Sequence, residues 1–248
     1  MTQRLAGRVV LITGAESGIG RATALRVVAE GAALAAVGLD EPALALLVDE
    51  IRAHGGNAFM AVADVSDPEA IQGAVDELVH ELGALDVAYA NAGVLVPAAP
   101  LDDLDLDVWN RVLAVDLTGV LVTFRAAVPH IGRAGGVLLA TGSSLAARPG
   151  VGTLAYVAAK AGVHVIVRSL ALELAPRNIR ANVIAPGLTD TPMTRDIEGH
   201  IERGLSGVPL GALVQPEEVA ALAVYLMTDD ARSITGSVFT VDGGRSAA

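Results

Sequence analysis

Tyr156 and Lys160 are four residues apart, and their types and spacing suggest acid/base chemistry. On a helix, these side chains project from the same face, one turn apart. An ammonium group near a phenol favours the phenolate, so the pair predicts a tyrosine whose pKa is lowered from about 10 toward working pH. Such a phenol can serve as general acid and base for a hydroxyl or carbonyl group. The alternative is that both side chains lie on a solvated helix face.

Ser143 is the second residue whose type and position predict a chemical role. It follows the apolar run 136–141, which predicts a buried strand. A hydroxyl at the end of that strand is expected beside Tyr156, where it would hold the reacting oxygen of a substrate.

A glycine-rich segment follows the first predicted strand, residues 9–12. Gly14 permits a tight turn, Gly18 lets the backbone approach a pyrophosphate, and Gly20 allows close packing of the following helix on the strand. That helix, predicted from about residue 21 to 30, would present free N–H groups and its positive dipole end to phosphates. A strand before the glycines and a helix after them favour a dinucleotide site over a plain turn.

Asp40 lies near the tip of the second predicted strand, 33–37, but about two residues late. It is expected either to bind the ribose of the adenosine or to cap the helix that begins near Pro42. No Arg or Lys occurs at positions 15–20 or 38–40 to bind a 2′-phosphate. The sequence therefore favours NAD over NADP.

Two further polar residues follow predicted strands. Asp64 comes after the strand 58–62, and it would contact adenine or cap the helix that begins at Pro68. Asn91 follows the strand 85–90. Because ligands of parallel sheets bind at the carboxyl ends of the strands, both residues are expected beside the glycine-rich segment.

Strands and helices alternate along the whole chain, which predicts right-handed βαβ units and one α/β domain over residues 1–248. Residues 193–214 are irregular and rich in glycine, and we expect them to form a mobile substrate lid. The later predicted elements are helices over 104–129 and 155–175, a strand over 179–184, a helix from Pro216 and a strand over 237–241.

Composition excludes several classes of function. The net charge of −11 argues against nucleic acids and anionic membranes as partners. No apolar run reaches about 18 residues, the length that spans a bilayer. The chain has no cysteine and its five histidines are scattered, so no metal site is expected. The N-terminus leads directly into a strand, which suggests a cytoplasmic protein.

Several motifs agree in identity, order and spacing, and together they resemble the short-chain dehydrogenase/reductase family over essentially the whole chain. The matching segments are 13–20 (TGAESGIG), Asp64-Val65, Asn91-Ala92-Gly93, Ser143, Tyr156-x-x-x-Lys160, Asn182, Pro186-Gly187 and Asp242-Gly243-Gly244.

The resemblance implies a doubly wound, Rossmann-like, seven-stranded parallel sheet with helices on both faces, and a nicotinamide cofactor. It implies Tyr156 as proton donor or acceptor, Lys160 as the group that lowers its pKa and binds the nicotinamide ribose, and Ser143 as the residue that orients the substrate. The carboxamide would be held by the Thr189 backbone and the Thr191 hydroxyl. The full set expected to contact the cofactor is Gly14, Ser17, Gly18, Ile19, Gly20, Asp40, Asp64, Val65, Asn91, Gly93, Tyr156, Lys160, Pro186, Gly187, Thr189 and Thr191.

Two positions depart from the family pattern. Asp116 stands where the family usually has an Asn linked to a proton path from Lys160. Its carboxylate would either make only structural hydrogen bonds or favour a charged Lys160 and alter the pH profile. Gly38 stands where NAD-preferring members usually have Asp, which leaves the choice of cofactor open.

The function expected from this resemblance is the NAD(P)-dependent interconversion of a secondary alcohol and a ketone on a small, rather apolar substrate. One alternative is an NADPH-dependent 3-oxoacyl-[carrier protein] reductase, for which Arg148, Arg195 and Arg203 could form a basic entrance. Another is a nucleotide-binding regulator without turnover. A homotetramer is also implied. The side chains expected to line the substrate site are Leu95, Leu145, Val151, Leu154, Leu188 and Met193.

Overall fold

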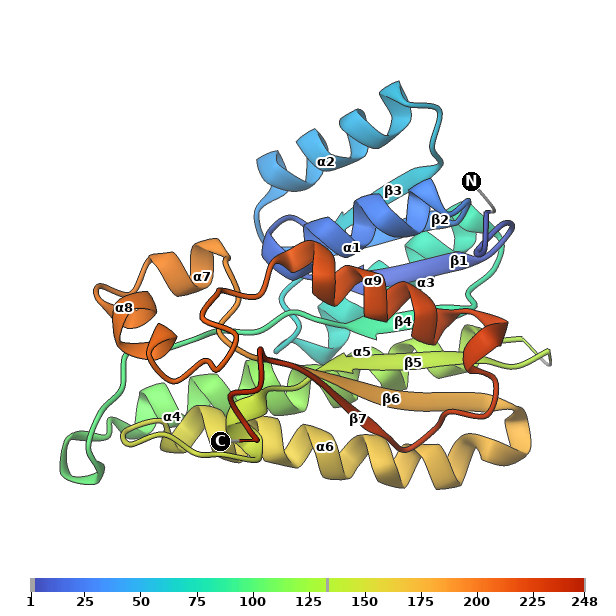
Figure 1. Ribbon diagram of the computed structural model, residues 1–248. Coiled ribbons are helices and arrows are strands. Elements are labelled where there is room, and N and C mark those ends of the chain that lie inside the picture. Colours follow the sequence, from blue (N-terminus) through green and yellow to red (C-terminus); the bar gives the residue numbers. More distant parts are fainter. Residues whose placement is uncertain (1–2, 133, 248) are drawn as a thin grey trace.

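A computed structural model describes residues 3–132 and 134–247 (Figure 1). Of the domain expected over 1–248, Met1, Thr2, Arg133 and Ala248 lie outside the described residues. The strands are β1 Val9–Thr13, β2 Ala33–Gly38, β3 Ala58–Val62, β4 Val87–Ala90, β5 Gly136–Thr141, β6 Ile179–Pro186 and β7 Val238–Val241. They form one parallel sheet in the order β3-β2-β1-β4-β5-β6-β7, which confirms the predicted fold.

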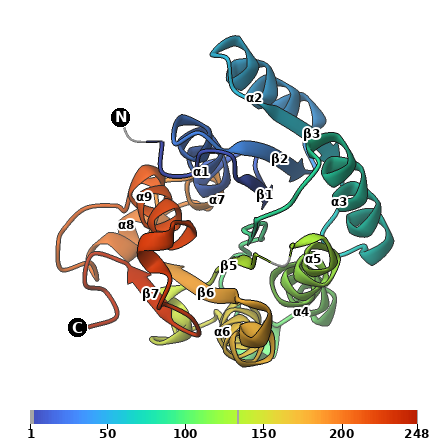
Figure 2. The same cartoon turned by 90° about the vertical axis from the view of Figure 1, so that its right-hand side faces the viewer.

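The helices cover both faces of this sheet, as the end-on view in Figure 2 shows. They are α1 Gly18–Ala29, α2 Glu41–Ala53, α3 Pro68–Leu82, α4 Leu106–Leu113, α5 Gly119–Ala127, α6 Leu154–Leu174, α7 Pro192–Arg195, α8 His200–Leu205 and α9 Pro216–Met227. Helices α1, α2 and α9 pack on one face, and α3, α5 and α6 pack on the other. Both layers are needed because strands of a parallel sheet expose apolar side chains on both sides.

Strand β1 shows how one short sequence serves both layers. Its Val9 and Leu11 belong to the apolar core under α3, α5 and α6, whereas Val10 and Ile12 belong to the core under α1, α2 and α9. Successive side chains of a strand point to opposite faces, so an unbroken apolar run fills two cores. Because both faces of such a strand are apolar, polar side chains gather at its ends.

The predicted helix 104–129 is interrupted. Between α4 and α5 the chain makes a π-helical turn, Ala114–Thr118, which contains the buried Asp116. A π turn has wider hydrogen-bond spacing than an α-helix, and such turns occur often at functional sites. By length and composition, the stretches Leu106–His130 and Leu154–Arg177 could each cross a membrane, but in this fold one side of each stretch packs into the core under the sheet.

The segment expected as a lid, 193–214, contains most of α7 and all of α8. Its two ends meet at an isolated parallel bridge between Thr189 and Val214. There, Val214 N–H donates to Leu188 O and Asp190 N–H donates to Val214 O. The loop therefore leaves and rejoins the sheet at one point, beside the carboxyl end of β6.

Helix α1 begins at Gly18, about three residues earlier than expected, so Gly18 and Gly20 lie in its first turn. A Cβ atom on Gly20 would lie 1.9 Å from the carbonyl oxygen of Gly14, a distance that no backbone shift of a few tenths of an ångström can relieve. The tight turn and the start of α1 thus depend on the absence of a side chain at Gly20.

We expect Gly20→Ala to lower the free energy of unfolding by about 1–3 kcal/mol, as overpacking of a closed site does. Differential scanning calorimetry would show the melting temperature falling by several degrees. Gly73→Ala is the matched control, because Gly73 lies in the middle of α3 with no atom within 4 Å of its added Cβ. That change should raise stability by about 0.5–1 kcal/mol. Equal changes in melting temperature for Gly20→Ala and Gly73→Ala would contradict the argument that Gly20 is too closely packed for a side chain.

Candidate active site

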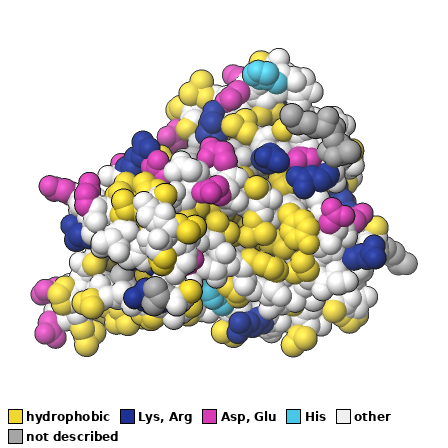
Figure 3. Space-filling model, viewed as in Figure 1, with side chains coloured by type: hydrophobic (Ala, Val, Ile, Leu, Met, Phe, Trp, Pro, Cys, Tyr) yellow, Lys and Arg dark blue, Asp and Glu magenta, His cyan; other side chains and the backbone are white. Residues whose placement is uncertain are grey.

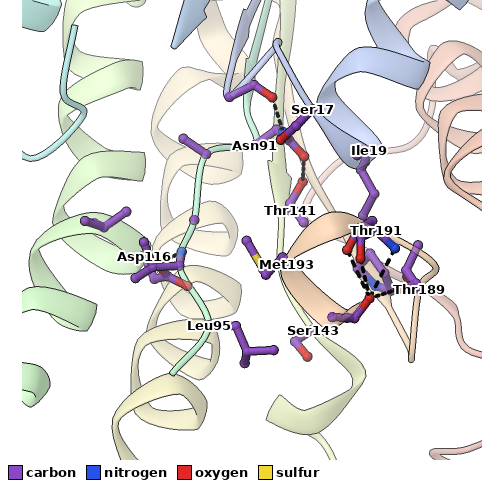
Figure 4. Close-up of a pocket in the computed structure, with 18 of the residues that line it drawn as sticks. Ser17, Ile19, Asn91, Leu95, Asp116, Thr141, Ser143, Thr189, Thr191 and Met193 are labelled. Atoms are coloured by element: carbon purple, nitrogen blue, oxygen red, sulfur yellow. Dashed lines mark hydrogen bonds between the residues drawn. The ribbon is translucent and has the colours of Figure 1, made fainter. Parts of the chain in front are cut away.

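An open cavity lies at the carboxyl ends of β1, β4, β5 and β6 (Figure 4). It brings together the four predicted catalytic residues, Ser143, Tyr156, Lys160 and Asp116. It is also lined by most of the predicted cofactor residues: Gly14, Ser17, Gly18, Ile19, Asp64, Val65, Asn91, Gly93, Pro186, Gly187, Thr189 and Thr191. Gly20 and Asp40 are not among its lining residues.

Lys160 is almost completely buried at the floor of this cavity, with 3% of its surface exposed. Its Nζ donates a hydrogen bond to Thr141 O at 3.1 Å and lies 3.2 Å from Asp116 Oδ2. An ammonium group has three N–H donors, and the hydrogen bond to Thr141 O uses one of them, so donor capacity remains for a ligand in the cavity. The opening above is kept clear by Gly93, where a Cβ would approach both Lys160 Nζ and Asp116 Oδ2 to 3.3 Å.

Asp116 is completely buried and forms an ion pair with Lys160. Its other oxygen, Oδ1, accepts a hydrogen bond from Val94 N–H at 2.8 Å. Oδ2 approaches the ammonium closely but without the alignment of a good hydrogen bond, so the attraction there is mainly charge against charge. Of the two expectations for this carboxylate, the structure shows both the structural hydrogen bond and the contact with charged Lys160.

The pKa of Lys160 reflects this pairing. Burial by itself would lower the pKa of the amine, but the negative charges of Asp116 and of an ionised Tyr156 outweigh burial and raise it above its ordinary value. Lys160 is therefore a cation at neutral pH, and its charge is fixed rather than titrating during a reaction near pH 7.

The pKa of Tyr156 moves against the sequence-based expectation. Burial raises the pKa of the phenol, and the charge of Asp116 adds to that; Lys160 and the Ser143 hydroxyl act in the opposite direction without overcoming it. The Lys160 ammonium lies 5.6 Å from the centre of the Tyr156 ring, which remains partly exposed. Lys160 acts in the expected direction, but the expected net lowering of the Tyr156 pKa was wrong for the protein by itself, because burial, helped by the Asp116 charge, outweighs the lysine.

The glycine-rich turn fits a dinucleotide pyrophosphate. Gly14 and Gly18 both have left-handed backbones, at φ +64° and +49°, which glycine adopts without strain. A Cβ on Gly18 would lie 3.0 Å from the side chain of Thr191, so the absence of a side chain at Gly18 keeps the space between these two residues open. Helix α1 has no acidic side chain in its first turn and no capping side-chain hydrogen bond from Ser17, which leaves its N–H groups free for phosphate.

Thr189 and Thr191 lie across the cavity from Asp116, close to Ile19 (Figure 4). Their positions are fixed by Thr194, whose hydroxyl donates to Thr189 O at 2.6 Å and lies 3.2 Å from the Thr191 hydroxyl. The predicted role of these two residues toward a carboxamide stays a prediction.

Asn91 braces the glycine-rich turn instead of reaching into open space. Its amide nitrogen donates to Thr13 O at 3.1 Å and to Gly14 O at 3.3 Å, and its Oδ1 accepts a hydrogen bond from the Thr141 hydroxyl at 2.9 Å (Figure 4). The side chain thereby joins the ends of β1, β4 and β5 into one rigid edge. Its effect on any ligand acts through the position of that edge.

Asp64 has partners that the sequence did not suggest. Its Oδ1 accepts hydrogen bonds from the Ser66 amide and hydroxyl, and its Oδ2 lies 3.2 Å from the Arg111 guanidinium. Burial opposes ionisation, but these hydrogen bonds and the Arg111 charge hold the pKa of Asp64 below its usual value. The expectation that Asp64 caps α3 was wrong, because Asp67 makes that cap by accepting from two N–H groups of the first turn.

Of the two roles expected for Asp40, the structure shows the helix cap. The Asp40 carboxylate accepts a hydrogen bond from Ala43 N–H at 3.0 Å and caps α2, outside the lining of the cavity. The place beside the end of β2 is taken by another carboxylate, that of Glu16. Glu16 Oε1 accepts a hydrogen bond from Leu39 N–H at 3.0 Å.

The substrate end of the cavity is apolar on most sides. Leu95, Leu145, Leu188 and Met193 line it as expected, and Leu95, Met193 and Ser143 border the same open space in Figure 4. Val151 and Leu154 do not line it; they are 96% and 49% exposed on the outer surface. A second, apolar hollow adjoins the first through Leu95 and Tyr156, which line both.

Several lining residues were not predicted from the sequence, and among those with polar or charged side chains are Glu16, Arg111, Thr141, His200 and Arg245. Glu16 lies inside the glycine motif, Thr141 lies two residues before Ser143, and Arg245 directly follows the motif that ends at Gly244. Their places beside these motifs were signals that could have found them, whereas Arg111 and His200 had no such signal.

Comparisons with known proteins agree with this geometry. A family model described as enoyl-(acyl carrier protein) reductase matches residues 14–246. The chain is 39% identical to cis-4-hydroxycyclohexanecarboxylate dehydrogenase of Sinomonas cyclohexanicum over the whole of both chains. It is 38% identical to cyclohexanol dehydrogenase of Acinetobacter sp. (strain SE19), over 98% of this chain and 96% of that one.

Solved structures give the same result. A short-chain dehydrogenase from Burkholderia cenocepacia J2315, determined in complex with NADP, superposes with a TM-score of 0.93 and 37% sequence identity, over 99% of this chain and 100% of that one. With matches of this extent in both sequence and structure, the chain belongs to the short-chain dehydrogenase/reductase family.

Proposed function

We propose that this protein is an NAD-dependent dehydrogenase that interconverts small cyclic secondary alcohols and their ketones. The observation that carries the proposal is the placement of Ser143, Tyr156 and Lys160 on one cavity with the glycine-rich turn of α1. The apolar substrate end, and relatives named for alcohols of six-membered carbon rings, support the substrate class.

In this proposal, the bound nicotinamide supplies the hydride acceptor for alcohol oxidation and the donor for ketone reduction. Tyr156 takes the hydroxyl proton of the alcohol, or returns it to the ketone oxygen, as general base or acid. The Ser143 hydroxyl, at the end of β5, donates a hydrogen bond to the same oxygen and orients it. Lys160 keeps a positive charge beside the phenol, so the proton leaves Tyr156 more easily than burial alone would allow.

An N–H of Lys160 is available to hold the nicotinamide ribose, since the ammonium makes a hydrogen bond to Thr141 O and an ion pair with Asp116 that leave donor capacity free. A positive charge on the oxidised ring would add to that of Lys160 and favour the phenolate. The residues thus fit a reaction in which Tyr156 becomes a competent base only when the cofactor is in place.

NAD is the proposed cofactor because the part of the cavity nearest the end of β2 offers no free cation among the described residues. Glu16, Gly38 and Leu39 line that part, and Arg111, the nearest lining cation, is paired with Asp64. A 2′-phosphate needs an unpaired Arg or Lys there.

The substrate end of the cavity does contain an unpaired cation. Arg111 pairs with Asp64 and Lys160 with Asp116, whereas Arg245 forms no ion pair with any described residue. His200 lines the cavity too, and burial together with the charges of Arg245 and Arg203 lowers its pKa, so it is neutral near pH 7. We propose that Arg245 binds a carboxylate on the substrate ring.

A carrier-protein substrate has less support. Of the three arginines considered for a basic entrance, Arg195 is paired with Asp190, whereas Arg203 and Arg148 donate to the backbone oxygens of Glu198 and Arg245 and keep their charge. The overall charge of −11 would also repel an acidic carrier protein.

We also propose a homotetramer. Exposed apolar side chains lie on α5 and α6, where Leu121, Val165 and Leu172 are 44%, 63% and 82% exposed. Figure 3 shows hydrophobic side chains gathered between α9 and the edge strand β7. Apolar surface of this kind is typical of interfaces between subunits.

The proposal predicts that the protein, mixed with NAD and cyclohexanol, produces NADH that is detected by its absorbance. Tyr156→Phe should lower kcat at least about 100-fold, because the general base is lost. Tyr225→Phe is the control, since Tyr225 lies on α9 outside the cavity. Binding of NAD without turnover of any secondary alcohol would instead support a nucleotide-binding regulator.

The ion pair predicts an altered pH profile for Asp116→Asn. The Asp116 charge raises the pKa of Tyr156, so its removal should shift the rising limb of kcat for alcohol oxidation to lower pH. We expect kcat at the new optimum to keep at least about a tenth of the wild-type value. A shift to higher pH would show that Lys160 needs the carboxylate to remain charged; a near-complete loss at every pH would show that the carboxylate itself is required.

The assignment of Arg245 predicts a selective loss for Arg245→Gln. We expect kcat/KM for 4-hydroxycyclohexanecarboxylate to fall about 10- to 100-fold, the worth of a charge-assisted hydrogen bond, with little change for cyclohexanol. Arg232→Gln, at an exposed position outside the cavity, is the control. Equal losses on both alcohols would reject a carboxylate-binding role for Arg245.

A further inference from the structure

We infer that Glu16, from the glycine-rich turn, is the receptor for the adenosine ribose hydroxyls and the residue that selects NAD against NADP. This inference rests on the proposed use of a nicotinamide cofactor, and it assigns the recognition of the ribose hydroxyls to a residue outside β2. Three observations carry it: an unpartnered carboxylate oxygen, a glycine whose nearest neighbouring atoms all belong to that carboxylate, and the ion pair with Asp64 that engages Arg111 among the described lining residues.

The Glu16 carboxylate is half satisfied. Its Oε1 accepts a hydrogen bond from Leu39 N–H at 3.0 Å, which fixes the side chain across the end of β2. Its Oε2 is shielded from solvent and has no hydrogen-bond partner in the described part of the chain. A buried acceptor without a donor is costly, and native proteins rarely leave one without a reason. Because Glu16 lines the cavity, a rotation of its carboxyl group would turn this oxygen toward a ligand hydroxyl, which is the donor that would satisfy it.

Gly38 shows that the space beside β2 is reserved for this carboxylate. A Cβ atom on Gly38 would lie 2.1 Å from Glu16 Oε2 and 2.4 Å from the carboxyl carbon. The backbone of Gly38 is not left-handed, so its conformation would accept any residue. The space beside Gly38 is therefore occupied by the end of the Glu16 side chain, which would have to move if position 38 carried a Cβ atom.

The chemistry of the two cofactors then decides the selectivity. The vicinal hydroxyls of an adenosine ribose are hydrogen-bond donors and suit an acceptor-only carboxylate. A 2′-phosphate has no such donor at neutral pH and would bring two negative charges to a carboxylate in a poorly solvated place. Arg111, which lines this end of the cavity, is held at 3.2 Å by Asp64 and also contacts the Ser66 hydroxyl, so it does not offset that repulsion.

Isothermal titration calorimetry of the protein with NAD and with NADP, without substrate, tests the inference through the ratio of the two Kd values. We expect wild type to bind NAD more tightly, and Glu16→Gln to reduce that preference at least about tenfold, mainly by tightening NADP. Asp40→Asn is the matched control: Asn caps a helix as well as Asp does, so the cap of α2 is kept and the ratio should not change.

A second variant keeps the inference testable if Glu16→Gln disturbs the turn. In a Glu16→Ala background, Gly38→Asp returns a carboxylate to the same space from the strand, and NAD preference should return with it. An unchanged ratio in Glu16→Gln, or a loss of preference in Asp40→Asn, overturns the assignment to Glu16. Failure of wild type to bind either dinucleotide overturns the proposed function instead, so the two failures are distinguishable.

Discussion

The site depends on a buried cation and on the groups that make its burial tolerable. An ammonium removed from water must be paired and hydrogen-bonded. Lys160 meets this requirement through the carbonyl of Thr141 at the end of β5 and the carboxylate of Asp116 in the π turn. Each partner comes from a different element, so the charge is in place only when β5, α6 and the α4–α5 region are packed together. Formation of the fold and completion of the acid/base machinery are thus one event.

The two members of the same ion pair shift the pKa of Tyr156 in opposite directions. Lys160 pulls the pKa of Tyr156 down while Asp116 pushes it up, and in the protein alone the upward effects prevail. A phenol held mostly protonated is a ready acid for ketone reduction, whereas alcohol oxidation needs additional positive charge nearby. An oxidised nicotinamide is itself cationic, so the arrangement couples the protonation of Tyr156 to the redox state of the bound cofactor.

The sequence predicted the fold and the residues that gather at the sheet edge because both follow from local patterns. Strand 58–62 and the start of helix α3 at Pro68 were placed to the residue, and Gly14, Gly18, Ser143, Tyr156 and Lys160 were placed in one cavity. What the sequence could not supply was the pairing of side chains. Three aspartates near strand ends were interchangeable by position, yet Asp40 and Asp67 cap helices and Asp64 pairs with Arg111, 47 residues away.

The partners of these carboxylates could not be predicted for a common reason. A carboxylate has several competing partners whose energies differ little, and long-range contacts decide among them. The interruption of the helix at 114–118 shows the same limit: apolar periodicity continued through it, and only the packing around Asp116 and Lys160 reveals the π turn.

The contact between Glu16 and position 38 has a consequence for how this cofactor site can change over generations. Any side chain introduced at position 38 first meets the carboxylate, so Glu16 must swing aside before the new residue fits. The reverse order involves no such clash, because loss of Glu16 leaves a space that a new residue on the strand can fill. Adaptation of this branch to a phosphorylated dinucleotide would therefore meet less steric resistance if the turn changed before the strand.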